Sequence, residues 1–123
     1  VAHARGVTPE AFDGFDPNAY LPTAAADAAA RSLDNLVAFN RRSAKTHSGI
    51  WRDLAVRKRR TEVDAQLGIV VTLGHDVAVP TPLTERLVEL IHDIETGVRA
   101  QSLDTLDILA ACRTATALHG YRV

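Results

Sequence analysis

The stretch from Lys45 to Asp64 holds the side chains of this chain that are best suited to chemistry. Thr61 is expected to cap a helix, with Asp64 three residues on as in a capping box, and Glu62 falls in the first turn. A carboxylate there can orient a lysine that donates a proton, or accept a hydrogen bond from a substrate hydroxyl. Acidic residues in a first helical turn also simply stabilise the helix dipole, by about 0.3–1 kcal/mol each at exposed sites. The sequence alone supports both the catalytic and the structural interpretation of Glu62.

Another short helix is expected to begin near Ser48, before the helix that starts at Thr61, and its start suits a small anion. Backbone N–H groups at a helix start favour negative charge, and Gly49 would let a bulky substrate approach the backbone closely. Ser48 is equally interpretable as a plain N-cap. Trp51, the only tryptophan, is interpreted as a core residue or as cover for a domain interface.

Other clusters of polar residues carry weaker signals. The basic run from Arg57 to Arg60 favours a solvated loop, because no aromatic residues are interleaved with it as nucleic-acid binding would require. Glu89 and His92 form an acid–histidine pair at i, i+3, as in di-iron bundles, but the second pair and the further glutamates of such a site are missing. Both are predicted to lie exposed on the polar face of a helix. The other histidines lack metal-ligand spacing, so we predict no metal site.

Composition bounds the class of protein. The 123 residues suit one domain, and 46 % apolar with 24 % charged residues is ordinary for a globular protein. The formal net charge of −1 gives no overall attraction to nucleic acid or to a membrane, and no apolar run is long enough to cross a bilayer. One cysteine, Cys112, excludes an internal disulfide framework. We expect a cytoplasmic protein with neither nucleic acid nor membrane as partner.

The hydrophobic periodicity predicts helices throughout. Residues 1–6 are typical of a helix end stopped by glycine, so we expect a fragment of a longer protein, and a turn-rich connector held by aromatic residues follows. Helices are expected over 23–41, from Ser48, from Thr61 to a stop at Gly74, from Pro82 to a stop at Gly97, and from Ser102 to near Gly120. The fold class is therefore all-α, with five to six helices.

Several sequence elements then occur in a distinctive order. They read Ser48-Gly49-Ile50-Trp51-Arg52-Asp53, the basic run, Thr61-Glu62-Val63-Asp64, and a proline-started helix after Gly74. This order resembles the C-terminal helical domain of the ketopantoate reductase (2-dehydropantoate 2-reductase) family. That family's pattern is Ser-Ser-Met, two variable residues, Asp, a short basic stretch, Thr-Glu, an aliphatic residue and Asp. This chain has Gly49 in place of the second serine, and its link from Asp53 to Glu62 is one residue longer than the commonest pattern.

The resemblance implies a fold like the helical domain of 6-phosphogluconate dehydrogenase, with residues 1–123 as a single substrate-side domain. The parent protein would be an NADPH-dependent oxidoreductase of pantothenate biosynthesis type, reducing a small 2-oxo acid to a 2-hydroxy acid. Glu62 takes the place of the family's cleft-facing glutamate and is the candidate catalytic residue. Ser48, Gly49 and Asp53 are the candidate substrate-binding residues. The family's catalytic lysine lies upstream of this part, and the change at Gly49 puts ketopantoate itself in doubt as the substrate.

The resemblance also places the cofactor outside this chain. NADPH would be bound mainly by an N-terminal Rossmann domain that the chain lacks, because no Gly-x-Gly-x-x-Gly fingerprint is present. The fragment alone is therefore expected to be inactive, and no cofactor-binding residue is assigned. A homodimer is a possible assembly. The alternative is a non-catalytic helical module for binding or oligomerisation.

Overall fold

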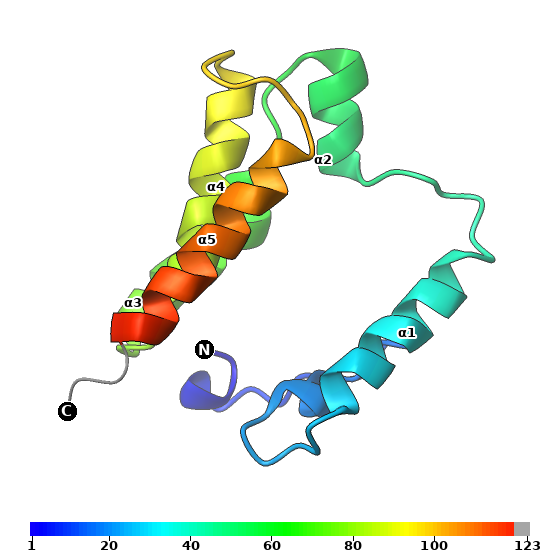
Figure 1. Ribbon diagram of the computed structural model, residues 1–123, viewed down its shortest axis with the longest axis vertical. Helices are drawn as coiled ribbons and strands as arrows, with labels where there is room; N and C mark the ends of the chain where they lie inside the picture. Colours follow the sequence, from blue (N-terminus) through cyan, green and yellow to red (C-terminus); the bar gives the residue numbers. More distant parts are fainter. Residues whose placement is uncertain (120–123) are drawn as a thin grey trace. The chain divides into compact units, whose positions relative to one another are not determined.

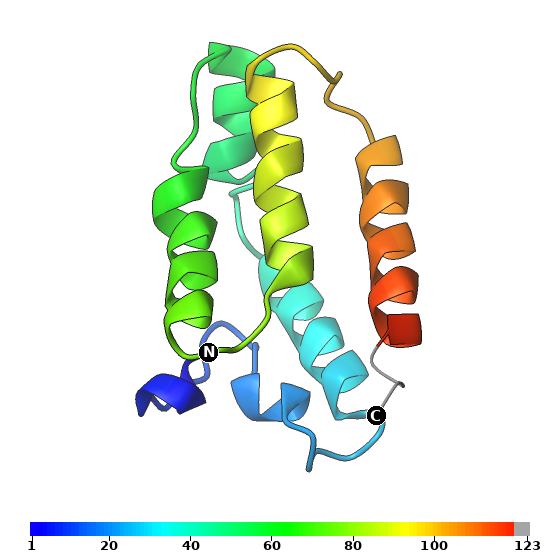
Figure 2. The ribbon, with the colours of Figure 1, turned by 90° about the vertical axis from the view of Figure 1, so that its left-hand side faces the viewer.

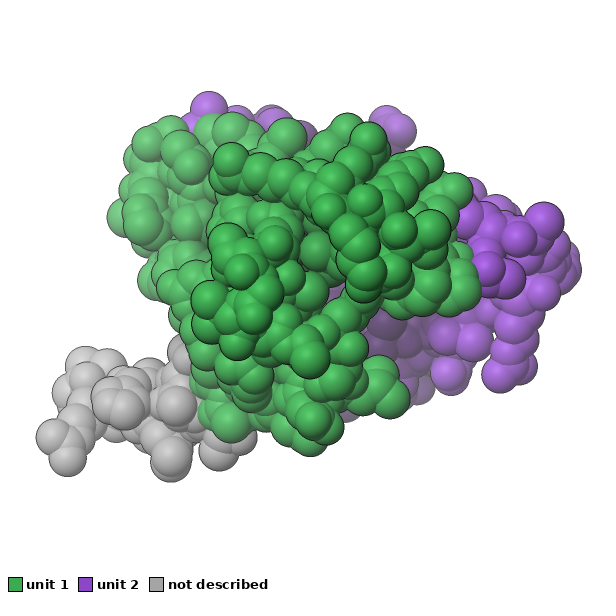
Figure 3. Space-filling view, turned by 90° about the horizontal axis from the view of Figure 1, so that it is seen from above, with its two compact units in different colours: residues 1, 47–123 green, residues 2–46 purple. Residues whose placement is uncertain are grey.

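The computed structural model describes residues 1–119, with side chains up to Cys112. This part of the chain is helical, with five α-helices and no β-strand beyond an isolated bridge between Phe12 and Phe15. The all-α prediction is confirmed. The chain divides into two compact units, one of residues 2–46 and one of residue 1 with residues 47–123 (Figure 3).

The unit of residues 2–46 consists of a connector and α1 (Ala28–Asn40). The predicted helix start at Thr23 is wrong, because residues 21–27 form bends and turns, with Ala24 N–H donating to the carbonyl of Leu21. The aromatic rings of the connector do stack on one another, yet Phe12 remains 61 % exposed. The connector is held on α1 chiefly by buried Ser32, whose Oγ accepts from Asp16 N–H at 2.9 Å.

The second unit begins with α2 (Gly49–Arg52), capped by Ser48 as predicted. The helix then widens into a π turn over Asp53–Arg57, which ends at Lys58 in the left-handed conformation, with φ 49°. After a short loop, a second π turn over Asp64–Gly68 leads into α3 (Ile69–Asp76).

Gly74 does not stop the helix, contrary to the prediction, since α3 continues to Asp76. Glycine is needed there for another reason. An added Cβ would lie 2.8 Å from the carbonyl oxygen of Val79, which folds back so closely that its own N–H donates to the carbonyl of Gly74. The position therefore serves a close backbone approach in the loop before Pro82.

The remaining helices are α4 (Pro82–Glu95) and α5 (Asp104–His119). Pro82 at the first position and left-handed Gly97 beyond the end agree with the predicted limits of α4. The predicted end of the last helix near Gly120 lies outside the described residues. The helix α4 lies between α3 and α5 (Figures 1 and 2).

The core of this unit forms where α4 meets the two π turns. Leu54, Val63 and Ile91 are buried together, and Val63 is fully buried. Partly buried residues pack around them: Ile50, Leu67, Leu87, Val88 and Ile94. This core fixes Val63, the residue that follows Glu62.

Candidate functional site

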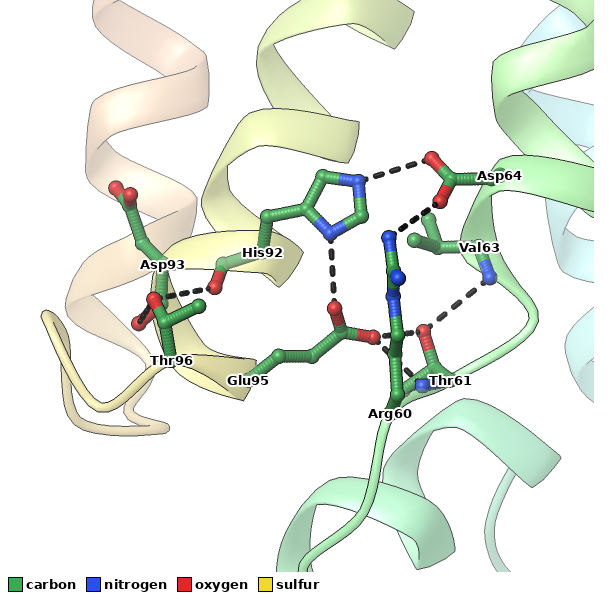
Figure 4. A network of polar contacts seen from close by, with 8 residues as sticks. All are labelled: Arg60, Thr61, Val63, Asp64, His92, Asp93, Glu95 and Thr96. Carbon is green, nitrogen blue, oxygen red and sulfur yellow. Dashed lines mark hydrogen bonds and ion pairs between the residues drawn. The ribbon is translucent and has the colours of Figure 1, made fainter.

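The turn from Thr61 to Asp64 is held to the last turn of α4 by a network of hydrogen bonds (Figure 4). The Oε1 atom of Glu95 accepts from both the backbone N–H and the hydroxyl of Thr61, each at 2.6 Å. The Thr61 hydroxyl oxygen in turn accepts from Val63 N–H at 3.2 Å. The predicted N-cap at Thr61 is wrong, because the N-cap position is Val63, which has no side-chain cap hydrogen bond. The predicted capping box is also absent, since Thr61 N–H donates to Glu95 rather than to Asp64.

Glu95 carries the negative charge at the centre of this network, and its side chain is only 5 % exposed. Burial would raise the pKa of Glu95, but the hydrogen bonds from Thr61 and His92 outweigh it and hold the pKa below its usual value of 4.5. The carboxylate is therefore ionised, and each of its oxygens is engaged inside the protein.

His92 closes the network on the other side. Its Nδ1 lies 2.8 Å from Glu95 Oε2 and its Nε2 lies 2.9 Å from Asp64 Oδ1. Hydrogen bonds to Glu95 and then to Asp64 raise the pKa of His92 above 6.5, against the opposing effect of burial. The bridging histidine thus joins the two carboxylates.

The prediction that His92 is a freely exposed residue paired with Glu89 is wrong. The imidazole is only one-third exposed, and its partners are Glu95 on its own helix and Asp64, 28 residues earlier in the chain. Glu89 instead pairs with Arg86 at 2.8 Å. A sequence pattern shows neighbours on one helix, so it could not reveal the partner on another.

Glu62 is directed differently from its neighbours in the same turn. Thr61 and Asp64 bond towards α4, and Val63 is fully buried between them in the chain. Glu62 itself is exposed, and its one side-chain hydrogen bond is with Gln66 Nε2, at 3.2 Å. Within the described residues Glu62 forms no ion pair, so its carboxylate is available to an external group.

Ser48 and Gly49 stand at the start of α2. Ser48 Oγ accepts from Trp51 N–H at 3.1 Å, which makes it an N-cap, and the Trp51 ring stacks on His47 with centroids 3.7 Å apart. Open space surrounds the position of a Cβ on Gly49, with no atom within 4 Å. The substrate-binding role of both residues stays a prediction.

Asp53 has its partners within its own turn. It is buried, and one oxygen accepts from Arg57 at 2.8 Å and from Arg59 at 2.9 Å. These bonds, that from Arg57 foremost, lower the pKa of Asp53 against the opposing effect of burial. The geometry supports a part in fixing the basic loop, and a substrate contact by Asp53 stays a prediction.

A hollow of about 470 Å³ lies beside the hydrogen-bond network and is lined by Arg60, His92, Glu95 and Thr96. Glu62 and Ser48 do not line it. Among the described residues no group of three or more acidic, histidine or cysteine side chains could hold a metal ion. The described helices also include none with the length and apolar character that crossing a membrane requires.

The part of the chain that the structure describes does not fit NADPH as a bound cofactor. The glycine-rich phosphate loop is missing from the sequence, and the described residues contain no strand from which such a loop could lead into a helix. The binding of NADPH by another part of the protein stays a prediction.

The fold and the Thr61–Asp64 turn define an all-helical domain that presents one carboxylate outward from a helix start. The chain belongs to the family described as Ketopantoate reductase PanE/ApbA C terminal, which it matches over residues 1–95. The family is one of oxidoreductases. The match ends with the last residue of α4 and so includes every candidate site residue. No curated protein and no solved structure matches the chain.

Proposed function

We propose that the chain is the substrate-side domain of an NADPH-dependent reductase that converts a small 2-oxo acid to a 2-hydroxy acid. Its catalytic residue in this proposal is Glu62, and a Rossmann domain elsewhere in the protein binds NADPH. A cytoplasmic place in pantothenate biosynthesis belongs to the same proposal. The chief support is the family match together with the outward carboxylate of Glu62.

The geometry of the turn explains how one carboxylate can be presented reliably. Thr61 is tied to Glu95, and Val63 is fully buried, so the backbone on either side of Glu62 is held by α4 and the core. A side chain on a held backbone loses less freedom when it meets its target, which favours catalysis. Glu62 can then orient a proton-donating lysine or bond to a substrate hydroxyl.

The reduction itself needs three further groups. A hydride must reach the keto carbon, a proton must reach the keto oxygen, and cations or helix N–H groups must hold the carboxylate of the substrate. The start of α2 at Ser48 and Gly49 is the candidate for the last task. Gly49 leaves open space where the family pattern has a serine. This space favours a 2-oxo acid that is bulkier than ketopantoate and that needs no hydrogen bond from a serine hydroxyl.

Steady-state kinetics of the complete protein containing this chain test the proposal. Glu62→Gln and Glu62→Ala should each lower kcat for the reduction of a 2-oxo acid by at least tenfold. Glu89→Gln serves as the matched control, because Glu89 is another exposed acid, on α4, and it should leave kcat unchanged. Near-normal turnover of both Glu62 variants would refute the catalytic assignment.

A binding or oligomerisation module is the second candidate function. Leu33 and Val37, one turn apart on α1, are 51 % and 48 % exposed, so α1 has an apolar face available to another surface. If the chain is such a module, mass measurement by light scattering should show a dimer that Leu33→Ser converts to a monomer. A monomer for both proteins would contradict it.

A further inference from the structure

A basic hollow of about 570 Å³ lies between the end of the Asp53–Arg57 turn and the loop after α4. It is separate from Glu62 and Ser48, which do not line it. Its lining combines four apolar side chains with three cations. The apolar residues are Leu54, Ala55, Ile94 and Ala100, and the cations are Lys58, Arg59 and Arg99.

The cations of the basic run differ in whether an acid neutralises them. Asp53 accepts from Arg57 and Arg59, and Asp64 accepts from Arg60 at 3.3 Å. Lys58 forms no ion pair with any described residue. The one acid that lines the hollow, Glu95, has both oxygens engaged by Thr61 and His92. The charge of Lys58 is therefore uncompensated.

The backbone of Lys58 adopts a conformation that favours glycine. Its φ of 49° and ψ of 48° lie in the left-handed region, and its N–H donates to the carbonyl of Asp53 to end the π turn. A non-glycine residue in this region carries strain, and such residues gather at binding sites. Lys58 shares this conformation with Asp13 and Ala78, but of the three only Lys58 lines the hollow.

Arg99 supplies a second cation, and its ion pair with an acid is a long one. Its Nε is buried and has no hydrogen-bond acceptor, and the nearest carboxylate oxygen, on Asp93, is 4.0 Å away. The side chain of Arg99 is not needed to cap α4. The last carbonyls of α4 already accept from the backbone N–H groups of Thr96, Gly97 and Arg99. The Arg99 side chain as a whole is one-third exposed and lines the hollow, so its guanidinium group can bond to an anion there.

We propose that this hollow binds a phosphate monoester between Lys58 and Arg99. Such a group carries a charge of about −1.5 to −2 near neutral pH, which suits a hollow lined by three cations and one acid. Guanidinium and phosphate also form paired hydrogen bonds. The apolar lining of Leu54, Ala55 and Ile94 gives the organic part of the ester a surface to contact. The proposal does not depend on the catalytic role of Glu62.

Calorimetric titration of the protein with 2′-AMP, glycerol 3-phosphate and inorganic phosphate tests this site. Saturable binding of at least one ester, tighter than that of inorganic phosphate and weakened by added salt, is the expected result. Tighter binding of 2′-AMP would assign the phosphate to a nucleotide, and tighter binding of glycerol 3-phosphate to a small metabolite. No saturable binding of either ester at millimolar concentrations would overturn the proposal.

Variants locate the binding within the molecule. Lys58→Gln and Arg99→Gln should each weaken ester binding at least fivefold. Arg60→Gln is the matched control, because it removes one charge from the same basic run without altering the lining of the hollow. If Arg60→Gln weakens binding as much as Lys58→Gln, the attraction is general and the site is refuted. Unfolding by urea, followed through Trp51, verifies that each variant is folded.

Discussion

Removing the carboxylate of Glu95 should loosen the turn that carries Glu62. In Glu95→Ala the half-buried N–H and hydroxyl of Thr61 lose their common acceptor, and His92 loses one of its two partners. Leaving buried donors without an acceptor costs about 1–3 kcal/mol, and bonds to a charged group lie in the upper part of that range. We therefore expect the free energy of unfolding to fall by about 2–3 kcal/mol.

Urea unfolding followed by fluorescence measures this loss, because Trp51 is the only tryptophan and belongs to the same compact unit as Glu95. With an m-value of about 1–2 kcal/mol/M, the midpoint should fall by about 1–3 M. Glu95→Gln should lose roughly half as much free energy, because its amide oxygen still accepts from Thr61 but carries no charge. Glu89→Ala, which removes an exposed carboxylate from the same helix, should leave the midpoint almost unchanged. An unaltered midpoint for Glu95→Ala would refute the structural role given to the network.

Three further predictions use the same unfolding assay. The raised pKa of His92 means that the stabilising effect of the protonated imidazole is complete below its ordinary pKa of 6.5 and is lost as the pH rises through the higher pKa of the folded state. The urea midpoint of the wild-type protein should therefore fall as the pH is raised from below 6.5, and His92→Gln should abolish this dependence. Ser48→Ala removes the N-cap of α2 and should lower the free energy of unfolding by about 1 kcal/mol; unchanged stability would contradict the capping role. Gly74→Ala forces a Cβ against the carbonyl of Val79 and should cost about 1–3 kcal/mol, whereas Gly49→Ala, with open space around it, should cost far less.

Local rules predict the helices of this chain well where one signal dominates. Pro82, the apolar stripe that includes Leu90 and Ile91, and Gly97 together define α4, because a start, a buried face and a stop all agree. The helical state of residues 69–71 is also confirmed, although their β-branched side chains are typical of strands.

The errors arise where distant parts of the chain decide the outcome. Gly74 is typical of a helix stop, yet its lack of a side chain allows the carbonyl of Val79 to lie close to its backbone. His92 looks solvent-facing, yet Asp64 and Glu95 draw it into the network. The sequence does not identify Glu95, because its hydrogen bond to Thr61 spans 34 residues and no local spacing of residues indicates it.

The π turn over Asp53–Arg57 has a consequence for how the two candidate segments keep their places. An α turn closes over four residues and a π turn over five. The resemblance predicts that the segment from Asp53 to Glu62 is one residue longer than the commonest family pattern. A π turn offers room for such a residue inside the helix rather than in the loop. Leu54 stays buried against Val63 and Ile91 with the wider coil in place. We infer that the wider π turn accommodates the predicted extra residue, so that the loop leading to the candidate carboxylate of Glu62 need not be longer.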